Sequence, residues 1–134
     1  MANYWAYGKK SFFHEHDRFR LVFSAKYNGL VDHAAISGDF SNVTLDGNIV
    51  GNATLFGGIN IGGNTVSNLV IKNNYIGTNG NGDDIGNIGG GLDIGDGVTN
   101  AVIENNTISN NFPGGGLNVN AANNIKITQN SFSC

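Results

Sequence analysis

The chain has 134 residues, a length that suits one domain, and only 13% of them are charged, about half the usual share. It carries instead 21 Gly and 23 Asn, residues that readily adopt left-handed backbone conformations, and this composition excludes an all-helical protein and a charged disordered chain. From His33 onward there are seven acidic residues and two Lys, a balance of −5. Such an acidic body is an unfavourable partner for nucleic acid and a better one for a divalent cation.

The first 32 residues are rich in aromatic side chains. They hold Trp5, three of the four Tyr and four of the eight Phe, and the alternation in residues 18–23 predicts one strand. We predict that residues 1–32 form an irregular cap over the end of the repeats that follow, with a poorly ordered leader or a fragment boundary as the alternative. His14 and His16 would share one face of a strand, but without a third ligand they indicate a polar surface rather than a metal site.

Signals for targeting or membrane insertion are not visible in the sequence. Lys9 and Lys10 are not followed by the apolar region of a signal peptide, and the longest apolar runs are too short to span a membrane. Cys134 is the only cysteine, so no disulfide can form within the chain. These features do not identify a compartment.

Residues 33–134 contain an internal repeat. Four nine-residue segments align without gaps, and a shorter second block recurs between them. We predict that each unit is one coil of a solenoid whose two short strands pair with those of the next coil, about 4.8 Å away. The segments begin at Asn42, Asn68, Asn100 and Asn124, spaced by 26, 32 and 24 residues, and the second block begins at Gly58, Gly91 and Gly116.

Five columns of the repeat are almost wholly aliphatic. They alternate with polar positions along each segment, and this period of two predicts that they point inward and stack into a core. The columns are Val43, Leu69, Ala101 and Ile125; Leu45, Ile71, Ile103 and Ile127; Val50, Ile76, Ile108 and Phe132; Ile59, Leu92 and Leu117; and Ile61, Ile94 and Val119.

A sixth column is Asn in every repeat. Its members are Asn48, Asn74, Asn106 and Asn130, each at the corner between two inward residues. A carboxamide at such a corner can bond the corner backbone and the carboxamides above and below it. We therefore predict a structural Asn ladder.

The runs Asn73–Gly82, Gly89–Ile94 and Asn105–Asn110 resemble those of the right-handed parallel β-helix repeat proteins of the pectin-lyase-like group. The resemblance covers about residues 36–134. It implies an all-β chain, with a right-handed parallel β-helix of three to four coils behind an irregular aromatic N-terminal cap, and an extracellular or cell-surface location. The group contains lyases, hydrolases, phage tailspikes and adhesins, so the resemblance says little about activity.

One coil is longer than the others by about seven residues. The extra residues fall within 77–90, and we expect them to bring Asp83 and Asp84 near Asp93 and Asp96. Carboxylate and carbonyl oxygens suit Ca²⁺, so these four aspartates are the candidate calcium ligands. The alternative is that they are solvated turn carboxylates, because the full calcium-loop pattern is absent.

Two polar rows are predicted on the outer faces of the strands. Asn60, Asp93 and Asn118 would lie on neighbouring coils, where they could hydrogen-bond the hydroxyls of a polysaccharide or cell-surface glycan; the alternative is ordinary polar-out alternation. In the other row Asp46, Lys72 and Glu104 alternate in charge, which indicates surface cross-strand pairing.

The sequence leaves two functions open. The first is a non-catalytic extracellular or cell-surface scaffold or binding module, with carbohydrate as ligand, or a piece of a larger surface protein. The second is a polysaccharide lyase or glycoside hydrolase, or a truncated piece of one, acting on acidic polysaccharide. In the group that the chain resembles, lyases use an Arg base, and residues 33–134 contain no Arg. End-to-end self-association is a further expectation, because the last coil after Phe132 would leave a strand edge uncovered.

Overall fold

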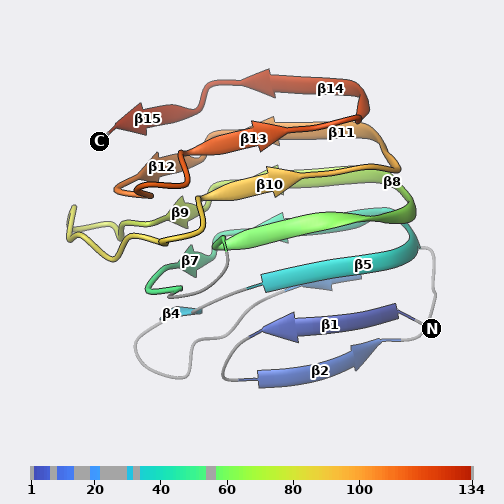
Figure 1. Cartoon of the computed structure of the whole chain (residues 1–134), viewed down its shortest axis with the longest axis horizontal. Coiled ribbons are helices and arrows are strands. Elements are labelled where there is room, and N and C mark those ends of the chain that lie inside the picture. Colours follow the sequence, from blue (N-terminus) through green and yellow to red (C-terminus); the bar gives the residue numbers. More distant parts are fainter. Residues whose placement is uncertain are drawn as a thin grey trace.

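The computed structural model of the chain is all-β (Figure 1). It describes the backbone of residues 2–6, 9–13, 19–21, 30–31, 34–53 and 57–133, and the side chains of residues 41–53, 57–62 and 65–133. This part of the chain contains no helix that is long and apolar enough to cross a membrane. The strands are β1 (Ala2–Ala6), β2 (Lys9–Phe13), β3 (Phe19–Leu21), β4 (Leu30–Val31), β5 (Ala34–Ser41), β6 (Val43–Asp46), β7 (Ile49–Val50), β8 (Ile59–Lys72), β9 (Tyr75–Ile76), β10 (Leu92–Ile94), β11 (Val98–Glu104), β12 (Thr107–Ser109), β13 (Leu117–Val119), β14 (Asn123–Thr128) and β15 (Ser131–Ser133).

The strands form two stacked sheets, one of 10 strands and one of 5. In the larger sheet, β5, β8, β10 and β13 pair in parallel, and β3, β6, β8, β11 and β14 form a second parallel run. The two runs meet in β8, whose 14 residues continue from one wall to the other. The smaller sheet pairs β4, β7, β9, β12 and β15 in parallel. Figure 1 shows these strands as successive levels, which we call rungs, an arrangement consistent with a β-solenoid.

The predicted core columns are in register between the rungs. Leu45 pairs with Ile71, Ile71 with Ile103, and Ile103 with Ile127. The first three of these side chains are 0% exposed, whereas Ile127 is 46% exposed because it lies in the last rung. The same register holds for Val50, Ile76, Ile108 and Phe132, for Ile59, Leu92 and Leu117, and for Ile61, Ile94 and Val119. The predicted stacking of aliphatic side chains is confirmed.

Two columns of left-handed residues explain part of the Asn content. The residue before Val43 and the equivalent residues in the other rungs are all Asn with φ between 55° and 59°. A second left-handed column lies just before the Asn ladder, and it includes one Gln. Asn tolerates this conformation better than other residues that carry a side chain, because its short amide can bond locally. The first column is Asn42, Asn68, Asn100 and Asn124, and the second is Gly47, Asn73, Asn105 and Gln129.

The N-terminal strands differ in direction from the rest. β1 pairs antiparallel with β2 on one side and with β5 on the other, so it lies between them and β2 is the last strand of this run. β3 and β4 pair in parallel with β6 and β7. The parallel ladders therefore reach back to Phe19, which lies N-terminal to the predicted boundary at residue 33. The cluster His14–Asp17 lies outside the described residues.

Candidate functional site

Asn60, Asp93 and Asn118 form one row across the wall made by β8, β10 and β13. Asp93 pairs with Asn60 on one side and with Asn118 on the other, as the repeat predicts. Asn60 and Asp93 are half-buried and Asn118 is exposed. The next position, on β5, is Ala35, so the polar row ends at Asn60. The structure therefore brings all three predicted binding residues together.

Glycine allows the oxygens of the row to converge. A Cβ at Gly57 would lie 3.1 Å from Asp93 Oδ2 and 3.2 Å from Asn60 Oδ1, so both acceptors lie over the same backbone position. The Asn60 amide nitrogen donates to the Gly57 carbonyl oxygen over 3.3 Å, which orients the Asn60 oxygen. Two such acceptors on adjacent rungs, about 4.8 Å apart, can receive hydrogen bonds from two hydroxyl groups of one ligand.

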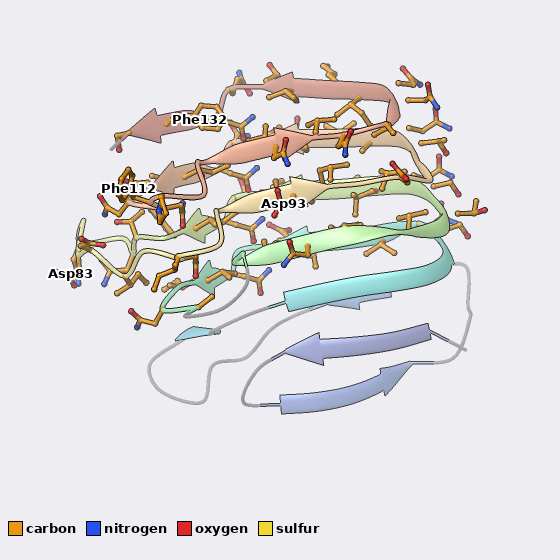
Figure 2. The ribbon with its side chains drawn as sticks, viewed as in Figure 1. Asp83, Asp93, Phe112 and Phe132 are labelled. Atoms are coloured by element: carbon orange, nitrogen blue, oxygen red, sulfur yellow. The ribbon has the colours of Figure 1, made fainter. Side chains whose placement is uncertain are left out.

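The structure does not bring the four candidate calcium ligands together. Figure 2 shows Asp83 at the edge of the molecule and Asp93 on the wall of the sheet, while Asp96 lies in the turn after β10. In the part of the chain with described side chains, no group of three or more His, Cys, Asp or Glu residues is placed to hold a metal ion. The expected gathering of Asp83 and Asp84 with the other two aspartates is therefore wrong, because the loop projects away from the wall.

The loop carboxylates bond within their own segment. Asp83 Oδ2 accepts from the Asn79 side chain over 2.7 Å, and Asn79 Oδ1 accepts from the backbone of Asn81 and Asp83. Asp84 Oδ1 accepts from the Gly86 backbone over 3.0 Å. These bonds are typical of turn-forming carboxylates. Calcium binding by any of these aspartates separately stays a prediction.

The excursion of the long coil occupies only part of the range 77–90 in which its extra residues were predicted. An isolated antiparallel bridge joins Thr78 and Asp84 and closes the excursion. The backbone then rejoins the wall, because the Asn52 nitrogen donates to the Ile85 carbonyl oxygen over 2.8 Å and the Ile88 nitrogen donates to the Ala53 carbonyl oxygen over 2.9 Å.

The predicted Asn ladder is confirmed by its hydrogen bonds. Asn48 donates to Asn74, Asn74 to Asn106 and Asn106 to Asn130, each through the side-chain amide over 2.9 Å. The first three side chains are at most 3% exposed. These residues are structural and take no part in the candidate site.

A second, shorter Asn ladder was missed in the sequence. The Asn87 side chain donates to Asn111 Oδ1 over 2.8 Å, and the Ala53 nitrogen donates to Asn87 Oδ1 over 3.1 Å. Asn87 lies five positions before Leu92, whereas Asn111 lies six before Leu117. Because of this difference of one residue, an alignment without gaps does not place Asn87 and Asn111 in the same column.

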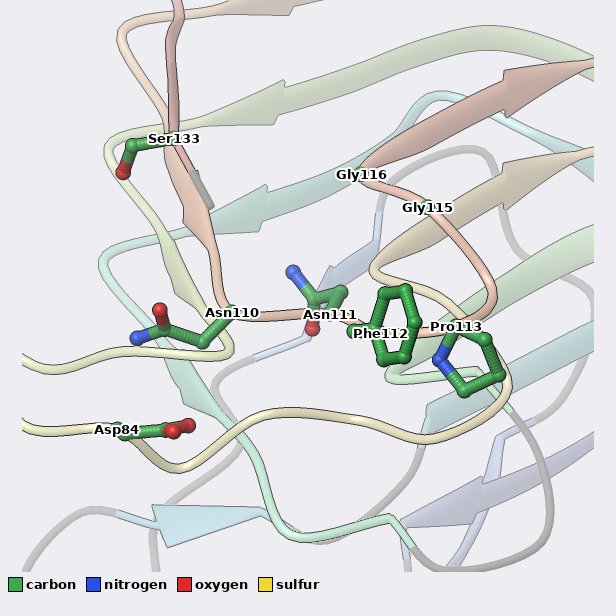
Figure 3. A pocket seen from close by; sticks show the side chains of 8 residues that line it. All are labelled: Asp84, Asn110, Asn111, Phe112, Pro113, Gly115, Gly116 and Ser133. Carbon is green, nitrogen blue, oxygen red and sulfur yellow. The ribbon is translucent and has the colours of Figure 1, made fainter.

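A hollow of about 390 Å³ lies beside the second ladder (Figure 3). It combines one aromatic ring, one carboxylate and exposed backbone. The Phe112 side chain is 84% exposed, so its ring is available to a ligand. The hollow is lined by Asp84, Asn110, Asn111, Phe112, Pro113, Gly115, Gly116 and Ser133.

The charged row Asp46, Lys72 and Glu104 lies on β6, β8 and β11, and its side chains pair at the surface. Lys72 pairs with Asp46 on one side and with Glu104 on the other. The Lys72 nitrogen lies 3.8 Å from Asp46 Oδ2 in an ion pair between partly exposed side chains. An exposed pair of this kind contributes little to stability, and it gives the row no chemical role.

Comparison of the chain with protein-family models, with curated proteins and with solved structures found no match.

Proposed function

We propose that the chain is a right-handed parallel β-helix of three to four coils that acts as a non-catalytic, extracellular or cell-surface module and binds carbohydrate along the row Asn60, Asp93 and Asn118. The single observation that carries this proposal is the register of that row. It places three hydrogen-bonding side chains at equal steps along one wall. Such a row matches a polymer that presents hydroxyl groups at intervals.

The chemistry of the row favours binding over catalysis. Hydrolysis of a glycosidic bond normally uses two carboxyl groups about 5–10 Å apart across the substrate. Asp93 has amides, not a second carboxylate, as its neighbours on both adjacent rungs. Residues 33–134 also lack an Arg that could act as the base of a lyase. Amides and a single carboxylate can orient sugar hydroxyls, and this is the role that we assign to them.

The test is binding of soluble polysaccharides and a glycan array, with and without Ca²⁺. We expect Asn118→Ala and Asp93→Ala to weaken the binding seen with the parent protein. Asn120→Ala is the matched control, since Asn120 is an exposed Asn just beyond β13 and outside the row. Absence of any glycan signal would refute carbohydrate binding.

Catalysis is tested separately on the same polysaccharides. Reducing-sugar release would reveal a hydrolase, and absorbance of an unsaturated product would reveal a lyase. We expect neither signal, with or without Ca²⁺. Turnover that Asp93→Ala abolishes would contradict the non-catalytic assignment.

End-to-end self-association stays a prediction. It concerns the exposed core positions of the last rung, Ile127 and Phe132.

A further inference from the structure

We propose that the hollow beside Phe112 is a separate site for one neutral pyranose ring, which stacks its apolar face on the Phe112 ring. The inference rests on the proposed function only in taking the ligand to be a carbohydrate. It concerns different residues from the polar row.

The Phe112 ring is the stacking platform. At 84% exposure it is the most exposed of the large hydrophobic side chains in the described part of the chain. Figure 3 shows the ring standing beside Pro113 at one side of the hollow. The C–H bonds on one face of a pyranose are apolar and slightly positive, and they complement the negative face of an aromatic ring. A sugar stacked there would cover a ring that is otherwise in water.

The platform is held by a rigid base. Asn111 is 7% exposed, its side-chain nitrogen donates to the Ile76 carbonyl oxygen over 3.0 Å, and its Oδ1 accepts from Asn87. The Gly115 nitrogen donates to the Asn111 carbonyl oxygen over 2.9 Å, which closes the turn that carries Phe112. A preformed turn loses little backbone freedom on binding, and this lowers the cost of association.

Polar groups lie opposite the ring. Asp84 and Asn110 line the other side of the hollow (Figure 3). Asp84 Oδ1 accepts from the Gly86 backbone, and this bond orients the carboxylate. Asn110 donates to the Gly77 carbonyl oxygen at 3.5 Å, a distance at the weak limit for a hydrogen bond. A carboxylate and an amide in these positions can accept and donate hydrogen bonds to ring hydroxyls.

The charge and the volume of the hollow determine which class of sugar can bind there. The lining residues include the Asp84 carboxylate and no Lys or Arg, so a uronic acid would place its own carboxylate near a like charge. A neutral hexose or an N-acetylhexosamine avoids this repulsion. The volume of about 390 Å³ is near the lower end of the range for small-molecule sites, about 300–1,000 Å³, and is large enough for the single ring that we propose.

The experiment is a titration followed by amide NMR spectra, with methyl β-glucoside, methyl β-galactoside and N-acetylglucosamine as neutral probes and galacturonic acid as the acidic probe. We expect at least one neutral sugar to shift the amide signals of Asn110, Gly115 and Gly116. Phe112→Ala should weaken that sugar's affinity about tenfold, as loss of an aromatic contact implies. Asp84→Asn should let galacturonic acid bind at the same amides.

The matched control is Ile88→Ala. Ile88 is another exposed hydrophobic residue, 52% exposed, and it does not line the hollow. Its variant should bind the neutral sugar as the parent does. The inference is overturned if these amides do not shift with any neutral sugar, if Phe112→Ala binds unchanged, or if galacturonic acid is the preferred ligand of the parent.

Polysaccharide binding by Phe112→Ala and Asn118→Ala separates the two proposals. If Asn118→Ala loses polymer binding while Phe112→Ala titrates like the parent, the hollow is not a sugar site and the polar row stands. If only Phe112→Ala is impaired, the hollow stands and the row fails. If neither monosaccharides nor polymers bind the parent, both proposals are refuted.

Discussion

The side-chain nitrogen of Asn74 donates to Oδ1 of Asn106 over 2.9 Å, and the backbone nitrogen of Asn74 donates to the same oxygen over 3.0 Å. Asn48 binds Asn74 in the same double manner. The side-chain amides of Asn74 and Asn106 therefore each accept two hydrogen bonds from the Asn of the preceding rung and donate one to the Asn of the following rung. The ladder joins the rungs at a corner, where the strand hydrogen bonds are interrupted.

Asn74→Ala should be strongly destabilising. The change removes two bonds that Asn74 Oδ1 accepts from Asn48 and two that its amide donates, to Leu45 and Asn106. We expect the free energy of unfolding to fall by about 3 kcal/mol, because the affected groups are buried. Chemical denaturation measures the change. Asn120→Ala, at an exposed Asn, should cost less than about 0.5 kcal/mol, and equal losses in both variants would argue against the ladder.

Gly91→Ala tests how closely the rungs approach one another. A Cβ at Gly91 would overlap the Gly116 carbonyl oxygen and lie 2.9 Å from a methyl group of Ile108. Because a backbone atom cannot move aside, we expect a loss of about 3 kcal/mol in denaturation experiments. Gly80→Ala is the control, since its nearest neighbours are Tyr75 atoms at 3.8 Å. A Gly91→Ala variant as stable as Gly80→Ala would show that the rungs are less tightly packed than described.

Ala121→Gly should stabilise the protein. Ala121 has a φ of 53°, and the equivalent position one rung below is Gly97 with a φ of 79°. A left-handed conformation costs an Ala roughly 1 kcal/mol that Gly does not lose, so we expect a gain of that size in thermal unfolding. Ala122→Gly should have the opposite sign, since Ala122 packs against the core. A destabilising Ala121→Gly would contradict the left-handed assignment.

Lys72→Glu should destabilise the charged row in a salt-dependent way. The new carboxylate would lie between Asp46 and Glu104 on the neighbouring rungs. Like charges directly opposite one another cost about 0.5–1 kcal/mol each, and added salt screens part of the repulsion. Melting temperatures at low and high ionic strength measure both effects. Lys126→Glu is the comparison, because its paired neighbour is Val102. Equal, salt-independent losses in the two variants would show that the row carries no electrostatic coupling.

The parallel ladders and the core were predictable because they repeat. Leu45, Ile71 and Ile103 occupy equivalent positions, and each column has to be aliphatic for the rungs to stack. The row Asn60, Asp93 and Asn118 follows from the same register, since the residue between two inward positions faces outward. A periodic sequence therefore specifies both the buried and the exposed columns.

The candidate calcium ligands and the hollow beside Phe112 depend instead on segments that do not repeat. The sequence could not show that the loop carrying Asp83 projects away from Asp93, because the path of an excursion depends on its own turns. The second ladder was hidden for a related reason, since the spacing to the next strand differs by one residue between Asn87 and Asn111. The hollow beside Phe112 joins a turn, the loop residue Asp84 and Ser133, which no local pattern connects.

From the residues alone one can deduce the all-β class, the parallel register of the repeated strands and the column of corner asparagines, because backbone pairing and burial impose the same requirement at every rung. Only the three-dimensional structure shows where the irregular parts lie: Asp83 and Asp84 are separated from Asp93 and Asp96, the insertion closes at the Thr78–Asp84 bridge, and Phe112 and Asp84 line opposite sides of one hollow. These residues lie outside the sequence repeat, so their positions depend on the three-dimensional path of each turn.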